Sequence, residues 1–84
     1  MNDRQKQIIR KLLDALDERD GRPASQTLLH GQISVKLEDR VLLTEFENAL
    51  AYCDSHGWLT SLSDELGTMQ WTLTPNGRAA RVNV

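Results

Sequence analysis

The sequence predicts an α+β fold in which a three-helix core precedes a two-stranded β-hairpin and a short C-terminal helix. Apolar residues recur at helical spacing in residues 3–19 and again in residues 44–56. Apolar and polar side chains alternate over residues 68–73, which is typical of a strand with one buried face. A chain of 84 residues holds one modest core, so we expect a single domain over residues 1–84.

The first helix is expected over about residues 3–19. Asn2 can cap its N-terminus, and Gln5 stands three residues on, as a capping box requires. Gly21 and Pro23 then end the helix. Its polar face runs from basic to acidic against the helix dipole, so these charges are not placed to stabilise the helix itself. The predicted buried face consists of Ile8, Ile9, Leu12, Leu13, Ala15 and Leu16.

The second helix is expected to be short. Ser25 can cap its N-terminus, and Gly31 favours a break soon afterwards. We interpret residues 34–43 as an ordered loop rather than as a continuation of the helix. The side chains expected to point inward from these two segments are Leu28, Leu29, Ile33, Val35, Leu37 and Leu42.

The third helix is the clearest element. Residues 44–47, Thr-Glu-Phe-Glu, match a capping box, and Gly57 supplies a left-handed residue after the last turn. His56 is expected at the negative end of the helix dipole. The predicted core-facing stripe consists of Phe46, Ala49, Leu50 and Cys53.

A β-hairpin is expected next, with strands over residues 58–62 and 68–73 and a turn over residues 63–67. Thr74 then caps the final helix, with Pro75 at its first position. In the second strand, one face is formed by Met69, Trp71 and Leu73.

Two stretches resemble the winged-helix (winged helix-turn-helix) family, and in particular small bacterial winged-helix regulators. "LTEFENALAYCDSHGWLT" is similar to the family's third helix with the opening of the wing. "MQWTLTPNGRAA" resembles the second wing strand running into an aromatic-x-Leu-Thr-x-x-Gly pattern. In this chain that pattern consists of Trp71, Leu73, Thr74 and Gly77. Together the two stretches cover about half of the chain, and the first 40 residues fit by element order only.

The resemblance implies a transcription regulator that binds double-stranded DNA with its third helix in the major groove. Residues 41–74, however, contain five carboxylates and no Lys or Arg, although the net charge of the chain is only −2. Phosphate contacts need cations, so we expect a non-standard DNA-contact surface built from other segments. Its candidate nucleic-acid-binding residues are Arg4, Lys6, Arg10, Lys11, Lys36, Arg40, Arg78 and Arg81.

The alternative hypothesis is a protein-protein interaction module. In this case the acidic third helix and wing would face a basic partner or a second copy of the chain, which makes a homodimer an option. Fold alone does not separate this hypothesis from DNA binding. The candidate interaction residues are Glu45, Glu47, Asn48, Tyr52, Asp64 and Glu65.

The two tryptophans allow different interpretations. Trp71 alternates with apolar neighbours, so we expect it to cover the core. Trp58 and Tyr52 could cover the core or could serve a partner surface, and both options stay open.

An enzymatic function is not expected. Residues 53–56 place Cys, Asp, Ser and His in a row, but catalytic triads are seldom built from consecutive residues. Cys53 continues the apolar stripe of its helix and is expected in the core. His30 and His56 lack metal-ligand spacing, so we expect no metal or cofactor. His30 is expected on the surface of its helix, and His56 is expected to cap the C-terminus of the third helix.

Composition bears on localisation. No apolar run approaches the roughly 20 residues of a membrane span, and residues 1–5 lack the apolar stretch of a signal peptide. Cys53 is the only cysteine, so no internal disulfide can form. We therefore expect a cytoplasmic protein that has no contact with a membrane.

Overall fold

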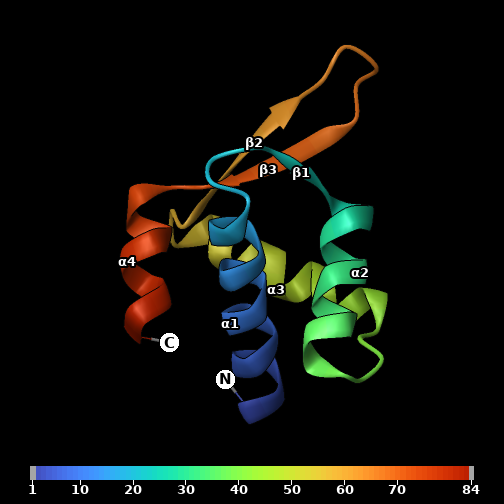
Figure 1. Cartoon of the computed structure of the whole chain (residues 1–84), viewed down its shortest axis with the longest axis vertical. Helices are drawn as coiled ribbons and strands as arrows, with labels where there is room; N and C mark the ends of the chain where they lie inside the picture. The colour runs from blue at the N-terminus through green and yellow to red at the C-terminus, as the bar shows by residue number, and fades with distance from the viewer. Residues whose placement is uncertain (1, 84) are drawn as a thin grey trace.

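The structure is a computed structural model that describes residues 2–83 (Figure 1). Its helices are α1 (Asp3–Glu18), α2 (Gln26–Leu37), α3 (Leu43–Ser55) and α4 (Pro75–Asn83), and its strands are β1 (Ala24–Ser25), β2 (Leu59–Ser63) and β3 (Met69–Leu73). The α+β class, the three helices before the hairpin and the final helix are thus confirmed. β1 was not predicted, because two small residues carry neither the alternation nor the branched side chains that indicate a strand.

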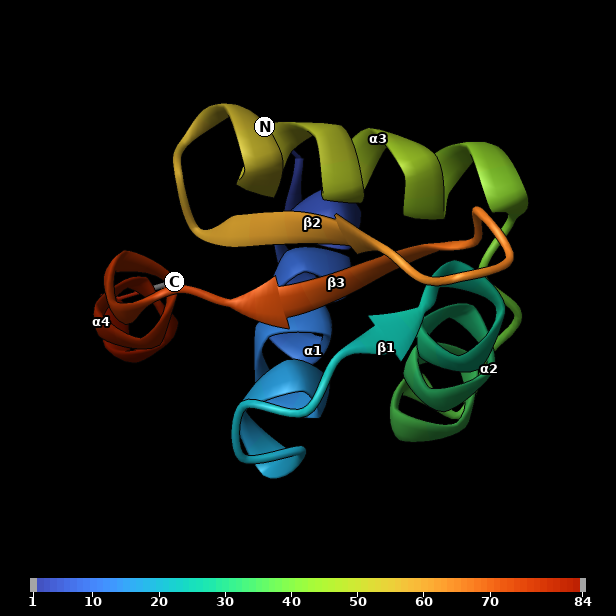
Figure 2. The same ribbon diagram turned by 90° about the horizontal axis from the view of Figure 1, so that it is seen from above.

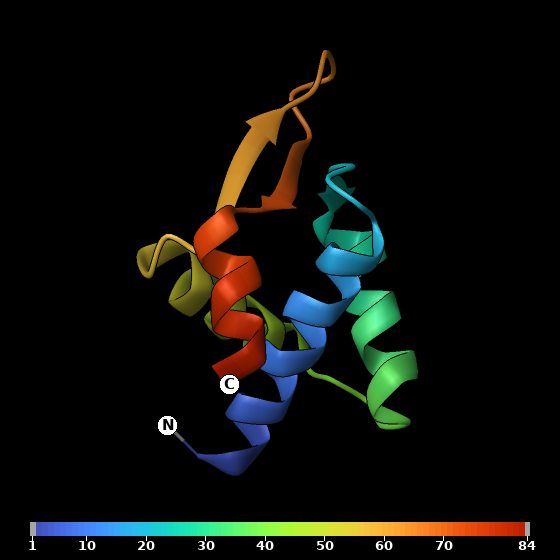
Figure 3. The ribbon, with the colours of Figure 1, turned by 60° about the vertical axis from the view of Figure 1, so that its left-hand side comes forward.

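The strands form an antiparallel sheet in the order β1-β3-β2, with β3 in the middle (Figure 2). Trp71 of β3 stands opposite Ala24 on one side and Ser61 on the other. Trp71 is only 7% exposed and Leu73 is half-buried, whereas Met69 is 46% exposed. The reason is that the hairpin projects beyond the helices, so its outer end has no core to cover (Figure 3).

Helix α1 is the centre of the helical layer and lies between α2 and α4 (Figure 1). The six residues predicted for its buried face are all buried. Asn2 caps the helix as expected, since its Oδ1 accepts a hydrogen bond of 2.7 Å from the backbone N–H of Gln5. The rest of the buried core comes from the other elements and consists of Ala24, Leu29, Ile33, Val41, Phe46, Ala49, Leu50, Cys53, Leu59 and Trp71.

The prediction for α2 and residues 34–43 is partly wrong. Helix α2 runs through Gly31 to Leu37, and Glu38 ends it in the left-handed conformation at φ 54°. The cost of a helical glycine, about 1 kcal/mol, is offset because the same helix buries two large aliphatic side chains. Val35 is 76% exposed, and the α2–α3 connection buries Val41 instead. Of the predicted inward side chains, those confirmed as buried or half-buried are Leu29, Ile33 and Leu37, and those found exposed are Leu28, Val35 and Leu42.

Helix α3 begins one residue earlier than its predicted cap. The N–H of Leu42 donates to Oε1 of Glu45 at 3.0 Å, so Glu45 and not Glu47 closes the first turn. The predicted box starting at Thr44 is therefore wrong. The predicted apolar stripe is buried as expected, and Gly57 adopts φ 72° after the helix.

Helix α4 is fixed to the base of the hairpin. Thr74 caps it as predicted, because Oγ1 accepts from the N–H of Gly77 at 3.0 Å and donates to the carbonyl of Gly57 at 2.6 Å. A Cβ at position 77 would overlap the carbonyl oxygen of Trp58 and lie 2.7 Å from Cδ1 of Leu73. Only glycine therefore allows α4 to approach the hairpin this closely.

Candidate interaction surfaces

Arg4 joins the N-terminal ends of α1 and α3. Its guanidinium donates to Glu45 Oε2 at 3.2 Å, to Asp39 Oδ2 at 2.9 Å and to the Arg40 carbonyl at 2.8 Å. The Arg4 hydrogen bond is the main reason that the pKa of Glu45 lies below its ordinary value, and the bond from Leu42 N–H adds to it. A candidate DNA-binding cation and a candidate interaction carboxylate thus neutralise each other.

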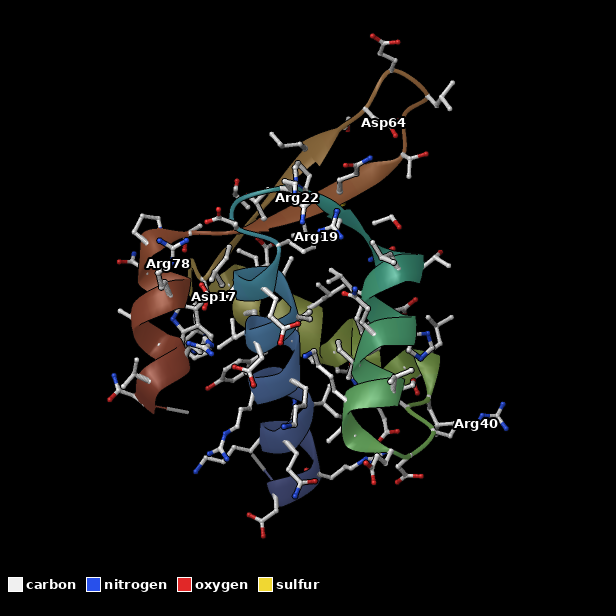
Figure 4. All side chains as sticks on the ribbon, viewed as in Figure 1. Asp17, Arg19, Arg22, Arg40, Asp64 and Arg78 are labelled. Carbon is white, nitrogen blue, oxygen red and sulfur yellow. The ribbon has the colours of Figure 1, made fainter. Side chains whose placement is uncertain are left out.

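Carboxylates in the C-terminal half of α1 form ion pairs with three further candidate cations, Lys36, Arg78 and Arg81. Arg81 Nε donates to Asp14 Oδ1 at 2.7 Å, and both Arg81 and Arg78 lie within 3.3 Å of the Asp17 carboxylate (Figure 4). Lys36 Nζ lies 2.6 Å from Glu18 Oε1. The hydrogen bond with Asp14 raises the pKa of Arg81. These carboxylates interact unfavourably with the dipole of α1, but their ion pairs hold α2 and α4 against α1.

The other four candidate cations are Lys6, Arg10, Lys11 and Arg40. Arg10 is exposed and already interacts with other groups of the chain. The side chains of the remaining three have no hydrogen bond or ion pair with residues 2–83. Arg40 points into solvent from the α2–α3 connection (Figure 4). The structure therefore leaves only part of the predicted cationic set available to a phosphate backbone.

Two cations outside the predicted set lie in the turn between α1 and β1. Arg19 donates to the carbonyls of Arg22 and Pro23, and Arg22 donates back to the Arg19 carbonyl (Figure 4). Both guanidinium groups thus bind carbonyl dipoles rather than carboxylates, so their charge is not cancelled. No sequence signal distinguished them, because the bonds depend on the turn geometry.

The candidate acidic residues fall into two groups. Asp64 stabilises the hairpin turn, since Oδ1 accepts from the N–H groups of Leu66 and Thr68 at 2.9 Å each and Oδ2 accepts from Gln70 at 3.2 Å. Glu45 is held by Arg4. Of the other candidates, Glu47, Asn48 and Glu65 are exposed, and their side chains form no hydrogen bond or ion pair within residues 2–83. The same is true of Asp54 on α3, which was not among the candidates.

Three rings form a cluster where α3 leads into β2. Tyr52 stacks on His56 with ring centroids 4.1 Å apart, and Trp58 lies 5.8 Å from Tyr52 and 5.0 Å from His56. His56 Nδ1 donates to the Tyr52 carbonyl at 2.8 Å, which confirms the predicted helix cap. Tyr52 and Trp58 are half-buried, so each covers part of the core and leaves part of its ring accessible.

Cys53 lies in the core, and His30 packs against it. Burial raises the pKa of the Cys53 thiol to about 12, which disfavours the thiolate that a nucleophile needs. His30 was expected on the surface of its helix, but it is half-buried, stacks on Phe46 at 5.1 Å and binds the Val41 carbonyl through Nε2. Within residues 2–83, no group of three or more His, Cys, Asp or Glu side chains could hold a metal ion.

An apolar groove on the outer face of α2 was not predicted. Gly31 has no side chain to fill the space between Leu28 and Val35, both of which are exposed. The prediction from the sequence placed Val35 inside the core, and for this reason it missed the groove. The groove is lined by Thr27, Leu28, Gly31, Gln32, Val35 and Lys36.

No protein-family model, curated protein or solved structure matches this chain. None of the helices in residues 2–83 has the length and apolar character needed to cross a membrane. The cytoplasmic location stays a prediction.

Proposed function

We propose that the chain is a winged-helix domain that acts by binding a macromolecular partner and not by catalysis. The order of its elements supports the fold, because three helices precede a hairpin that projects beyond them and a short helix follows (Figure 3). The burial of Cys53, with its raised pKa, supports a binding role over nucleophilic chemistry.

The partner that the geometry supports best is a basic protein segment, bound on the outer face of α3. The observation that carries this proposal is the uneven pairing of charges. Arg4, Arg78 and Arg81 are neutralised by the chain's own carboxylates. Glu47 and Asp54 on α3 are exposed, and no Lys or Arg lies anywhere in residues 41–74. An exposed helix with unpaired carboxylates attracts cations and repels phosphates.

A DNA-binding transcription regulator is the second candidate. It is favoured by the winged-helix resemblance and by Arg40, which points outward beside the start of α3 (Figure 4). Lys6 and Lys11 of α1 could add further phosphate contacts. Under this proposal DNA would approach from the N-terminal ends of α1 and α3 rather than along the outer face of α3.

A pair of titrations separates the two candidates. We expect a fluorescent lysine-rich peptide to bind with an affinity that falls with salt, and the double variant Glu47→Gln/Asp54→Asn to weaken it by about tenfold. We expect no binding of a labelled pool of genomic duplex fragments at about 50 mM salt.

The matched control is Asp20→Asn, which removes one exposed carboxylate in the α1–β1 turn without disturbing α3. Asn suits its left-handed backbone at φ 53°. If Asp20→Asn weakens the peptide as much as the α3 variant does, the attraction is not specific to α3 and the first candidate is wrong. Tight, salt-dependent binding of the duplex pool would replace it with the second.

A further inference from the structure

Strand β2 is an open edge of the sheet. The strand order β1-β3-β2 pairs β2 with β3 on one side, and within residues 2–83 no strand pairs with its other side. Leu59 is buried where β2 leaves α3, but the four following residues, 60–63, are all exposed. The outer half of the strand therefore stands clear of the helices (Figure 1).

The hydrogen bonds at both ends of the hairpin show which backbone groups face outward. Thr74 N–H donates to the Trp58 carbonyl, and Asp64 N–H donates to the Thr68 carbonyl, both at 3.0 Å. Bonded pairs alternate in an antiparallel ladder, so positions 58, 60, 62 and 64 face β3. The N–H and C=O groups of Ser61 and Ser63 consequently point to the open edge.

The strand lacks the features that normally protect an edge. Residues 58–63 contain no charged residue and no proline, and the strand is free of glycine. Leu62 is 52% exposed on the sheet face that points away from the core, since it stands opposite Gln70. An exposed edge with unpaired backbone groups and an apolar side chain is suited to the addition of another strand.

We propose that β2 of a second copy pairs antiparallel with this edge, around a two-fold axis at Leu62. In this register Ser61 of each copy exchanges hydrogen bonds with Ser63 of the other, because both residues face outward. Leu62 meets Leu62 of the second copy at a site without hydrogen bonds, where side chains approach most closely. The two three-stranded sheets then form one continuous sheet.

The charges and the register of the hairpin favour a second copy as the occupant, because the edge is complementary to itself around Leu62. The central residues of the edge are neutral, so neither an acidic nor a basic segment gains an ion pair along it. The carboxylates of Asp64 and Glu65 lie at the turn, and the antiparallel arrangement places the two turns at opposite ends of the joined strands. Asp64 of one copy stands across from Thr60 of the other, so no like charges face each other along the paired strands.

Sedimentation equilibrium on the full chain tests the proposal. Over about 10 µM to 1 mM we expect a transition from monomer to dimer mass, because an interface of two short strands is small. Slowed hydrogen exchange of the Ser61 and Ser63 amides should accompany dimer formation. A monomer mass across the whole range would overturn the proposal.

Two variants and a control identify the edge. Leu62→Lys places like charges across the two-fold axis and should raise the dissociation constant about tenfold or more. Ser61→Pro removes an outward N–H while the bonds of Thr60 and Leu62 to β3 remain, so it should also abolish the dimer. Thr72→Lys adds the same charge on the same sheet face but on the central strand, and should retain the dimer.

Circular dichroism checks that each variant folds. If Ser61→Pro unfolds the hairpin, Leu62→Lys still decides the question, because its side chain already lies in solvent. A dimer that survives Leu62→Lys would contradict pairing at β2 and would direct attention to the α2 groove.

Discussion

The two sides of this small molecule differ in whether their charged side chains form ion pairs. On the side of α1, carboxylates and cations from α2, α4 and the α2–α3 connection bind one another. On the side of α3 and the hairpin, Glu47, Asp54 and Glu65 have no cation partner within residues 2–83, and a strand edge is open. The carboxylates of the C-terminal half of α1 therefore serve internal packing, whereas Glu47 and Asp54 of α3 are available to a partner.

The largest expected effect lies at the contact between the two sides, where α4 meets the hairpin. Gly77→Ala should destabilise the fold by about 2–3 kcal/mol, because the new methyl group overlaps the Trp58 carbonyl. Urea unfolding followed by tryptophan fluorescence measures this change. Gly31→Ala is the matched control, since its methyl group would enter open space in α2, and it should stabilise the protein by about 0.5–1 kcal/mol. Equal effects of the two variants would show that the close approach at Gly77 does not exist.

A smaller effect is expected from breaking the internally paired side. Asp14→Asn combined with Asp17→Asn removes the partners of Arg78 and Arg81, so α4 should loosen and its amides should exchange faster. Raising the salt should reduce the difference from the wild type, because these pairs are partly exposed. Glu47→Gln/Asp54→Asn removes as many carboxylates from α3 and should leave α4 unchanged. Faster exchange in both variants would indicate a general charge effect.

The loss of stability at acidic pH should reveal the contribution of the ion pair between Arg4 and Glu45. The folded pKa of Glu45 lies below its ordinary value of 4.5, so its contribution is complete above that pH and is lost as the pH falls through the lower folded value. Glu45→Gln should therefore flatten the loss of stability below about pH 4.5. Thermal unfolding at several pH values measures this, with Glu47→Gln as the control. An unchanged slope for Glu45→Gln would show that the ion pair with Arg4 contributes nothing.

The smallest effect is expected at the hairpin tip. Asp64→Ala removes three hydrogen bonds from an exposed turn, so the amides of Leu66 and Thr68 should exchange faster while global stability falls by less than about 1 kcal/mol. Glu65→Ala, at the neighbouring position, should change neither quantity. Hydrogen exchange by nuclear magnetic resonance distinguishes the two, and identical behaviour would exclude a role of Asp64 in the turn.

Local patterns predicted most of the fold. The apolar stripes of α1 and α3 and the Thr74-Pro75 junction have the correct residues, because each depends on neighbours within a few positions. Gly31 misled the prediction of α2, since its tertiary environment outweighs its weak helix propensity. β1 exists only because β3 offers it a partner, and two residues cannot signal that.

The candidate surfaces were harder to predict than the fold. The positions of Arg4 and Arg81 suggested free cations, but their partners are Glu45, 41 residues away, and Asp14, 67 residues away. Which charges cancel depends on which helices pack together, and no local spacing reports this. The carboxylates of Glu47 and Glu65 were identified correctly as exposed, because no cation nearby in the sequence or in the fold competes for them.

The reactivity of Cys53 can report on local opening of the structure. Cys53 of α3 is fully buried, and its carbonyl accepts a hydrogen bond from the Trp58 N–H just before β2. A thiol reagent therefore reaches the thiol only when this region opens. The rate of thiol labelling at a fixed pH thus measures how readily this region opens, without any introduced probe. A partner on α3 or a strand added to β2 that holds this region closed would lengthen the labelling half-time, and the change could be followed by mass spectrometry on the native chain.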